Sequence, residues 1–134
     1  MTRRALREQI FKIIFRAEFN SPGEMTEQIG FSVGDIEKLS EEDEAYIVDK
    51  SDKILAKLDV LDEEIAKISD GWNIGRIGKA ELAILRVAIF EMLYDDDVPY
   101  KVAINEAVEL AKIYDGDDAP AFINGIVNAV AKAS

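Results

Sequence analysis

The fold is decided by one stretch in the second half of the chain, Lys79-Ala-Glu-Leu-Ala-Ile-Leu-Arg-Val-Ala-Ile-Phe-Glu-Met-Leu-Tyr94. Its apolar residues do not keep to one stripe at helical spacing but cover every side. A helix that is hydrophobic all round is buried in the middle of a fold. We therefore expect a central helix over residues 79–94, ended by Asp95-Asp-Asp97. A buried Arg86 must be paired, and Glu106 is a candidate partner.

The rest of the chain also carries helical patterns, without sustained period-2 alternation. Further helices are expected over about 3–19, from Ser21 to about Gly30, from Ser40 to about Leu58, from about Asp59 to Ser69, from Pro99 to about Tyr114, and after Asp118. The stretch 59–69 is either a helix of its own or the continuation of a bent one. In the segment after Pro99, small residues recur every four positions at Ala103, Ala107 and Ala111, which lets another helix come close. The sequence thus predicts an all-α fold of six or seven helices.

The length of 134 residues predicts a single domain, 1–134, with its own core. The chain has no cysteine and no histidine, which excludes disulfides, thiol nucleophiles, the usual zinc sites and histidine acid–base chemistry. Cysteine-free composition fits a reducing cytoplasm, where we expect the protein. The first residues lack the apolar core of a signal peptide. The most apolar run, 82–94, is too short to span a membrane.

Charge is unevenly spread along this acidic chain, whose formal net charge is −11. Residues 1–17 hold five Lys and Arg residues against Glu8 alone. Arg3, Arg4 and Arg7 lie within about one helical turn, and guanidinium forks suit phosphate oxygens. A local basic tip could therefore bind nucleic acid although the overall field repels it. A merely solvated helix start explains the same pattern.

Four blocks of sequence together resemble the NusB family of transcription antitermination factors. They are Arg3-Arg-Ala-Leu-Arg-Glu8, Ile84-Leu-Arg-Val-Ala88, the run from Glu91-Met-Leu-Tyr94 into Asp97-Val-Pro-Tyr-Lys-Val-Ala-Ile-Asn-Glu-Ala107, and Phe122-Ile-Asn-Gly-Ile-Val127. The resemblance implies two packed three-helix subdomains. It also implies binding of boxA, a short single-stranded RNA element, jointly with NusE, a ribosomal protein of the small subunit. The pair would help RNA polymerase to pass terminators, chiefly in ribosomal RNA operons.

The resemblance further implies site residues. Arg3, Arg4 and Arg7 match the family's arginine-rich RNA-binding start, although position 5 is Ala where relatives often have a basic residue. Phe15 and Glu81 match positions at the partner interface. The purely structural alternatives are an apolar core position for Phe15 and a position favoured by the helix dipole for Glu81.

A second group of candidates lies nearer the C-terminus. Phe122 matches an aromatic residue near the RNA surface and could stack an unpaired base, or it could belong to the core face of the last helix. Asp118 is either an ordinary N-cap or a carboxylate that repels phosphate and lowers RNA affinity until the partner joins. Tyr100 and Lys101 are assigned a lesser part in RNA contact, because a helix N-terminus favours an anion.

Two other functions stay open. The acidic runs Asp95–Asp97 and Asp115–Asp118 could hold Mg²⁺ or supply catalytic carboxylates, but aspartate is common in turns. No phosphate loop, nucleotide fingerprint or nucleophile motif occurs, so we expect no catalysis, cofactor or metal. The other alternative is an RNA-free helical adaptor or a homodimer. Its interface would be the wide apolar arc of the first helix, which includes Phe11 and Phe15.

Overall fold

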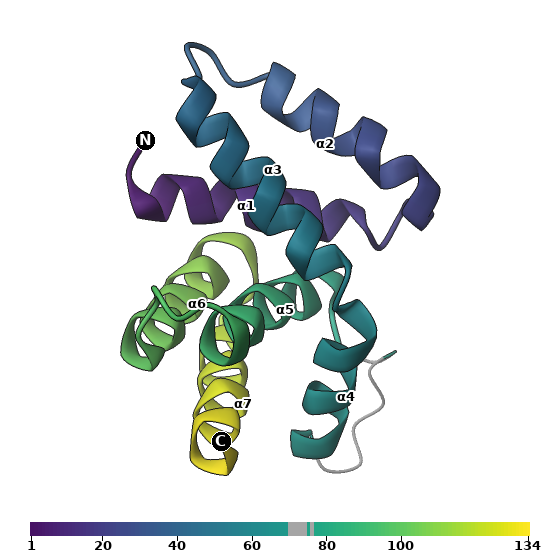
Figure 1. The fold of residues 1–134 in the computed structure, drawn as a ribbon. Coiled ribbons are helices and arrows are strands. Elements are labelled where there is room, and N and C mark those ends of the chain that lie inside the picture. Colours follow the sequence, from purple (N-terminus) through teal and green to yellow (C-terminus); the bar gives the residue numbers. More distant parts are fainter. Residues whose placement is uncertain (70–74, 76) are drawn as a thin grey trace. The chain divides into compact units, whose positions relative to one another are not determined.

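The computed structural model describes residues 1–69, 75 and 77–134, and these contain seven α-helices, one 3-10 helix and no β-strand (Figure 1). The α-helices are α1 (Arg3–Arg16), α2 (Met25–Gly34), α3 (Glu41–Leu55), α4 (Leu58–Ile68), α5 (Lys79–Tyr94), α6 (Tyr100–Tyr114) and α7 (Ala119–Ala133), and the 3-10 helix is η1 (Pro22–Glu24). The predicted all-α class and helix number are confirmed. Within the described part of the chain, no helix has the length and apolar character needed to cross a membrane.

The helices belong to two compact units, Met1–Ala56 and Lys57–Ser134. The first unit has three α-helices, as the family resemblance implies, and the second has α4 in addition to the trio α5–α7. The sequence left open whether α3 continues into one bent helix. The structure has two helices, because Lys57 leaves the helical conformation with φ −116° and ψ 14°. That residues 1–134 act as one domain stays a prediction.

In the first unit, α1 packs against α3, and α2 lies against both (Figure 1). Two side-chain caps fix where the packed pair begins. Thr2 Oγ1 accepts a hydrogen bond from the backbone N–H of Ala5 at 3.0 Å, and Ser40 Oγ accepts one from Asp43 at 3.1 Å. Each satisfies a backbone donor that the helix itself leaves without a partner. Thr2 and Ser40 are therefore the N-cap residues of α1 and α3.

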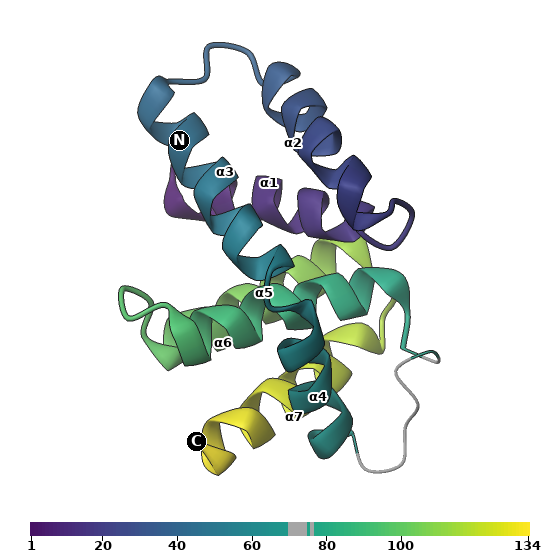
Figure 2. The same cartoon turned by 45° about the vertical axis from the view of Figure 1, so that its right-hand side comes forward.

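In the second unit, α5, α6 and α7 pack on one another, and α4 packs against α5 and α7 (Figure 2). Every residue of α5 from Leu82 to Met92 is buried, so the central helix expected from its apolar surface is confirmed. On α6 the ridge of Ala103, Ala107 and Ala111 is buried as well. Since alanine adds only a methyl group, the neighbouring helix backbones can approach closely.

The buried arginine of α5 is paired, as expected, and one partner, Asp62, lies on α4, whereas pairing with Glu106 stays a prediction. Arg86 donates from Nε to Asp62 Oδ1 at 2.9 Å and from Nη2 to Asp62 Oδ2 at 2.8 Å. This two-bond fork joins a buried guanidinium to a half-buried carboxylate and fixes α4 on the central helix.

Candidate nucleic-acid interface

The three arginines predicted to contact RNA all lie in the first turns of α1, but their exposure differs. Arg3 and Arg4 are exposed, whereas Arg7 is buried and only 7% accessible. The Thr2 cap fixes the start of the helix that carries them. Two guanidiniums are therefore accessible to a ligand in this structure, and an RNA contact by Arg7 stays a prediction.

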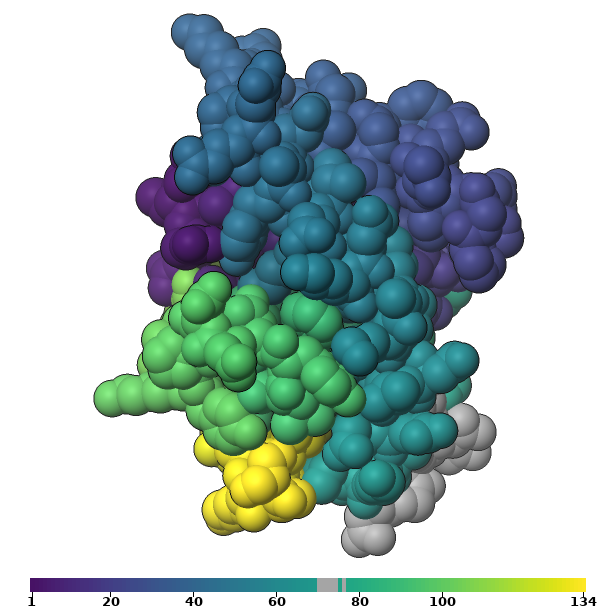
Figure 3. Space-filling view, viewed as in Figure 1, coloured from purple at the N-terminus to yellow at the C-terminus, as the bar shows by residue number. Residues whose placement is uncertain are grey.

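Arg3 lies on α3 rather than free in solvent. Its guanidinium carbon is 4.7 Å from the centre of the Tyr46 ring, and Lys50 Nζ donates to Tyr46 Oη at 3.3 Å. Next to this contact, the Met1 amine donates to Asp43 Oδ2 at 2.9 Å. That hydrogen bond lowers the pKa of Asp43; burial opposes the shift, and the charges of the amine and of Arg3 assist it. Figure 3 shows the N-terminal residues (purple) at the surface against α3 (blue).

A row of aromatic rings lies at the other end of α1. Phe15 is half-buried between Phe11, whose ring centre is 6.3 Å away, and Phe19, whose ring centre is 5.2 Å away. Phe19, three residues beyond the end of α1, is 60% exposed, so this row of rings reaches the surface. Arg3 and Phe15 are twelve residues apart, about 18 Å along the helix. The predicted RNA residues and the predicted partner residue of this unit therefore occupy opposite ends of α1.

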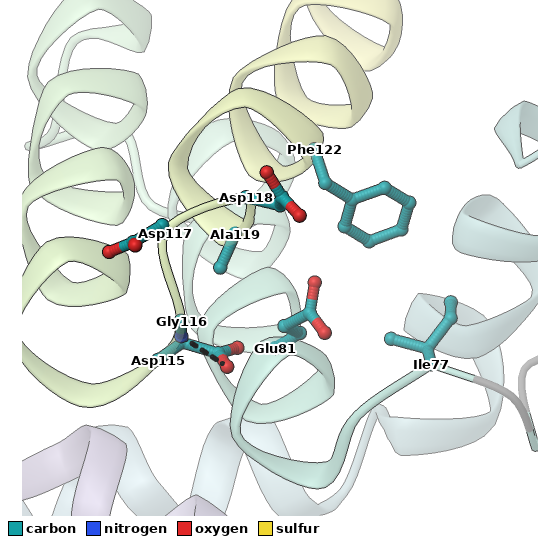
Figure 4. Close-up of a pocket in the computed structure, with 8 residues that line it drawn as sticks. All are labelled: Ile77, Glu81, Asp115, Gly116, Asp117, Asp118, Ala119 and Phe122. Atoms are coloured by element: carbon teal, nitrogen blue, oxygen red, sulfur yellow. Dashed lines mark hydrogen bonds between the residues drawn. The ribbon is translucent and has the colours of Figure 1, made fainter.

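The second unit contains a pocket of about 340 Å³ where α5 begins, α6 ends and α7 begins (Figure 4). It is lined by Ile77, Glu81, Asp115, Gly116, Asp117, Asp118, Ala119 and Phe122. Three residues that the sequence selected for different roles, Glu81, Asp118 and Phe122, thus meet around one hollow.

The pocket is strongly acidic. Burial raises the pKa of Glu81, the nearby charge of Asp115 raises it further, and a backbone hydrogen bond at Gly78 opposes the shift. Asp115 Oδ1 accepts a hydrogen bond from Gly116 at 2.8 Å, but its Oδ2 is buried without a hydrogen-bond partner among the described residues. All charged residues in the described lining are acidic. The pocket therefore favours a cation and repels phosphate.

The acidic residues do not gather into a metal site in the described part of the chain. In the described ranges 1–69, 75 and 77–134, no group of three or more Asp or Glu residues is arranged so that it could hold a metal ion.

Asp118 and Phe122 both lie at the pocket, where α7 begins (Figure 4). Asp118 stands at the N-cap position of α7, but its side chain makes no capping hydrogen bond, so the predicted cap is wrong. Its carboxylate is exposed and faces the pocket (Figure 4). Phe122 is half-buried and projects into the same pocket, whereas its neighbour Ile123 is fully buried in the core face of α7. A base-stacking role of Phe122 stays a prediction.

Tyr100 and Lys101 are exposed in the first turn of α6. The pocket lies at the opposite end of this helix, because Asp115 directly follows it. Fifteen residues of helix correspond to about 20 Å. The structure therefore does not bring Tyr100 and Lys101 together with Asp118 and Phe122, although both pairs were selected as RNA contacts.

Sequence reasoning missed Tyr46, the residue that lies under Arg3. A signal was present, because Asp43, Tyr46 and Lys50 follow one another at spacings of three and four and so share one face of a helix. Nothing local indicates that this face meets the arginines, since Arg3 and Tyr46 belong to different helices.

Comparisons with known proteins agree with this architecture. Residues 4–132 match the model of the NusB family. The transcription antitermination protein NusB of Lachnoclostridium phytofermentans is 47% identical over 130 residues, which cover 97% of this chain and 98% of that protein. NusB of T. maritima has the same fold with a TM-score of 0.85 at 28% identity, covering 98% of this chain and 92% of that one. A structure of antitermination factors NusB and NusE in complex with dsRNA gives 0.84 at 23% identity, with coverages of 98% and 97%, a likeness of fold alone.

Proposed function

The chain belongs to the NusB family of transcription antitermination proteins, and from this membership we propose that it binds boxA-type single-stranded RNA together with the ribosomal protein NusE. It would act in the RNA polymerase antitermination complex, chiefly on ribosomal RNA operons, in the cytoplasm and without catalysing a reaction. Residues 1–134 would act as one RNA-binding domain. The observation that carries the proposal is the exposed pair Arg3 and Arg4 at the capped start of α1 in an otherwise acidic chain.

The arginine tip is the proposed phosphate contact. Each guanidinium presents a planar fork of N–H donors to the phosphate oxygens. The acidic remainder of the chain repels RNA from other surfaces and so favours attachment at this tip. Tyr100 and Lys101 add a weaker anion contact at the start of α6. Arg7 is expected to contribute less than Arg3 and Arg4, because it is buried.

The acidic pocket is proposed to orient RNA and to receive the partner. A nucleobase is uncharged and can stack on the half-buried Phe122 ring, whereas the carboxylate of Asp118 keeps phosphates away. Glu81 is proposed to pair with a cationic group of NusE, and the Phe15 row on α1 to contact NusE through its apolar surface. The NusB and NusE complex that has a similar fold contains double-stranded RNA, so an RNA duplex is a second ligand to test.

A gel-shift titration with a boxA-like single-stranded RNA, run with and without NusE and repeated with a duplex, tests this proposal. The Arg3→Ala/Arg4→Ala double variant should lose roughly tenfold or more in affinity and show a shallower salt dependence, because fewer phosphates are neutralised. Lys12→Ala is the control for loss of a positive charge elsewhere on α1, since Lys12 is exposed on the same helix; it removes one charge where the double variant removes two. Absence of salt-sensitive binding by the wild-type protein, both alone and with NusE, would favour the RNA-free adaptor or homodimer.

A further inference from the structure

We propose that Tyr46 is a positioning residue for Arg3, whose guanidinium it holds so that the N–H groups stay available to an RNA phosphate. The inference rests on the proposed RNA binding. It adds to the RNA site a residue of α3 that itself need not touch the ligand.

The geometry of the contact leaves the donors of Arg3 available. The guanidinium carbon lies 4.7 Å from the ring centre of Tyr46, within the range of a cation–π contact. Such a contact is made to the π face of the ring, so it does not use the guanidinium N–H groups as hydrogen-bond donors. Within residues 1–69, 75 and 77–134, the Arg3 guanidinium has no hydrogen-bond acceptor and no ion-pair partner. A phosphate can therefore accept from a guanidinium that is already held in place.

The ring that holds Arg3 is itself fixed. Tyr46 is half-buried, and its hydroxyl accepts from Nζ of Lys50, a residue that is only 5% exposed. Lys50 Nζ also lies 5.5 Å from the centre of the ring. Because Lys50 is buried, it restricts the motion of Tyr46 and, through Tyr46, that of Arg3. A side chain restricted before binding loses less conformational entropy when the ligand arrives.

Asp43, the acid whose pKa the charge of Arg3 affects, does not compete for the same donors. Asp43 lies one turn before Tyr46 on α3, but its Oδ2 accepts from the Met1 amine at 2.9 Å. The charge of Arg3 acts on Asp43, whose pKa is lowered first by that amine. Asp43 therefore contributes to the field at the tip and forms no salt bridge with Arg3.

The test is a double-mutant cycle on RNA affinity, measured by fluorescence anisotropy with a boxA-like RNA in the presence of NusE. Tyr46→Leu should weaken binding about two- to fivefold, the value of an exposed cation–π contact. In an Arg3→Ala background the same change should cause no further loss. Tyr46→Phe should keep most of the affinity because the ring remains. Tyr94→Leu is the matched control, since Lys57 Nζ lies 4.3 Å from the Tyr94 ring centre in a similar contact of the other unit.

A second measurement does not depend on a stable Tyr46 variant. In the NMR spectrum of the wild-type protein, the ring current of Tyr46 should shift the Arg3 side-chain protons upfield, and this shift should persist in the RNA complex. Loss of the shift on RNA binding overturns the inference, as does an equal loss of affinity from Tyr46→Leu with and without Arg3. If Arg3→Ala weakens RNA binding but Tyr46→Leu does not, the inference fails while the proposed function stands. No RNA binding by the wild type overturns both.

Discussion

Arg86 on the central helix and Asp62 on α4 form a two-bond fork in which Nε lies 2.9 Å from Oδ1 and Nη2 lies 2.8 Å from Oδ2. The guanidinium side chain is 8% exposed and the carboxylate 26%. The two residues are 24 positions apart in the sequence, and their ion pair links α4 to α5, the helix at the centre of this unit. Its main role is therefore structural.

Removing the carboxylate of this pair should destabilise the protein. Asp62→Ala leaves the buried Arg86 without the fork, so the free energy of unfolding should fall by about 2–3 kcal/mol. Urea denaturation followed by circular dichroism measures the change. Glu63→Ala, an exposed substitution on the same helix, should change stability by less than about 0.5 kcal/mol. Equal stability of the two variants would contradict the structural role of the pair.

Neutralising Asp118 should strengthen RNA binding. Asp118→Asn removes a negative charge beside Phe122, and because Asp118 makes no capping hydrogen bond the helix should lose little stability. We expect affinity for a boxA-like RNA to rise about two- to fivefold at low salt, and the gain to shrink as salt screens the charge. Asp96→Asn makes the same change at an exposed site outside the pocket and is the control. Unchanged or weaker binding by Asp118→Asn would count against the repulsive role.

The environment of Glu81 predicts a pH dependence of stability. Burial and the charge of Asp115 raise its pKa above 4.5, so the folded state binds the Glu81 proton more tightly than the unfolded state does. The stabilising contribution is complete below pH 4.5 and is lost as the pH rises through the folded pKa. Glu81→Gln should therefore raise the urea midpoint at pH 7 relative to the wild type and leave a smaller difference at pH 4.

The same substitution tests the proposed partner contact. Glu81→Gln should weaken NusE binding in a pull-down or titration even though it stabilises the protein. Glu63→Gln, at an exposed position of α4, should leave the partner affinity unchanged. A Glu81→Gln variant with wild-type pH dependence would refute the assigned environment.

Replacing the ring of Phe122 should separate stacking from packing. Phe122→Leu keeps an apolar side chain of similar reach but removes the aromatic face, so RNA affinity should fall by about 1–3 kcal/mol if a base stacks there. Phe122→Tyr retains the face and should bind nearly as well as wild type. Thermal melting of both variants shows whether the fold is intact. Equal RNA affinity of the Leu and Tyr variants would assign Phe122 to packing alone.

The sequence predicted those elements whose cause is local. The bounds of α5 follow from its apolar surface and the three aspartates after it, and the predicted start at Ser40 follows from a residue type that is common just before a helix. The first helix was predicted to extend to about Phe19, because the apolar periodicity continues that far. In the structure it ends at Arg16. Helix ends are the feature that apolar spacing defines least well.

Contacts that depend on tertiary packing could not be predicted from the sequence. Asp62 looks like any acid on an amphipathic helix until α4 is placed on Arg86. The burial of Arg7 could not be inferred from a run of arginines that otherwise looks solvated. Glu81 and Asp115 are far apart in sequence, and the length of α6 returns the chain to the start of α5 so that they share a pocket.

The buried alanine ridge of α6 has a consequence for how binding can change in this fold. Ala103, Ala107 and Ala111 are buried where helices pack on one another, so a larger side chain there should strain the packing of those helices. Arg3 and Arg4 are exposed and constrain no neighbouring helix in this way. The alanine ridge thus determines how the helices pack, and different residues, such as Arg3 and Arg4, determine which ligand is bound. Two proteins can share this entire interior and still select different nucleic acids, or none.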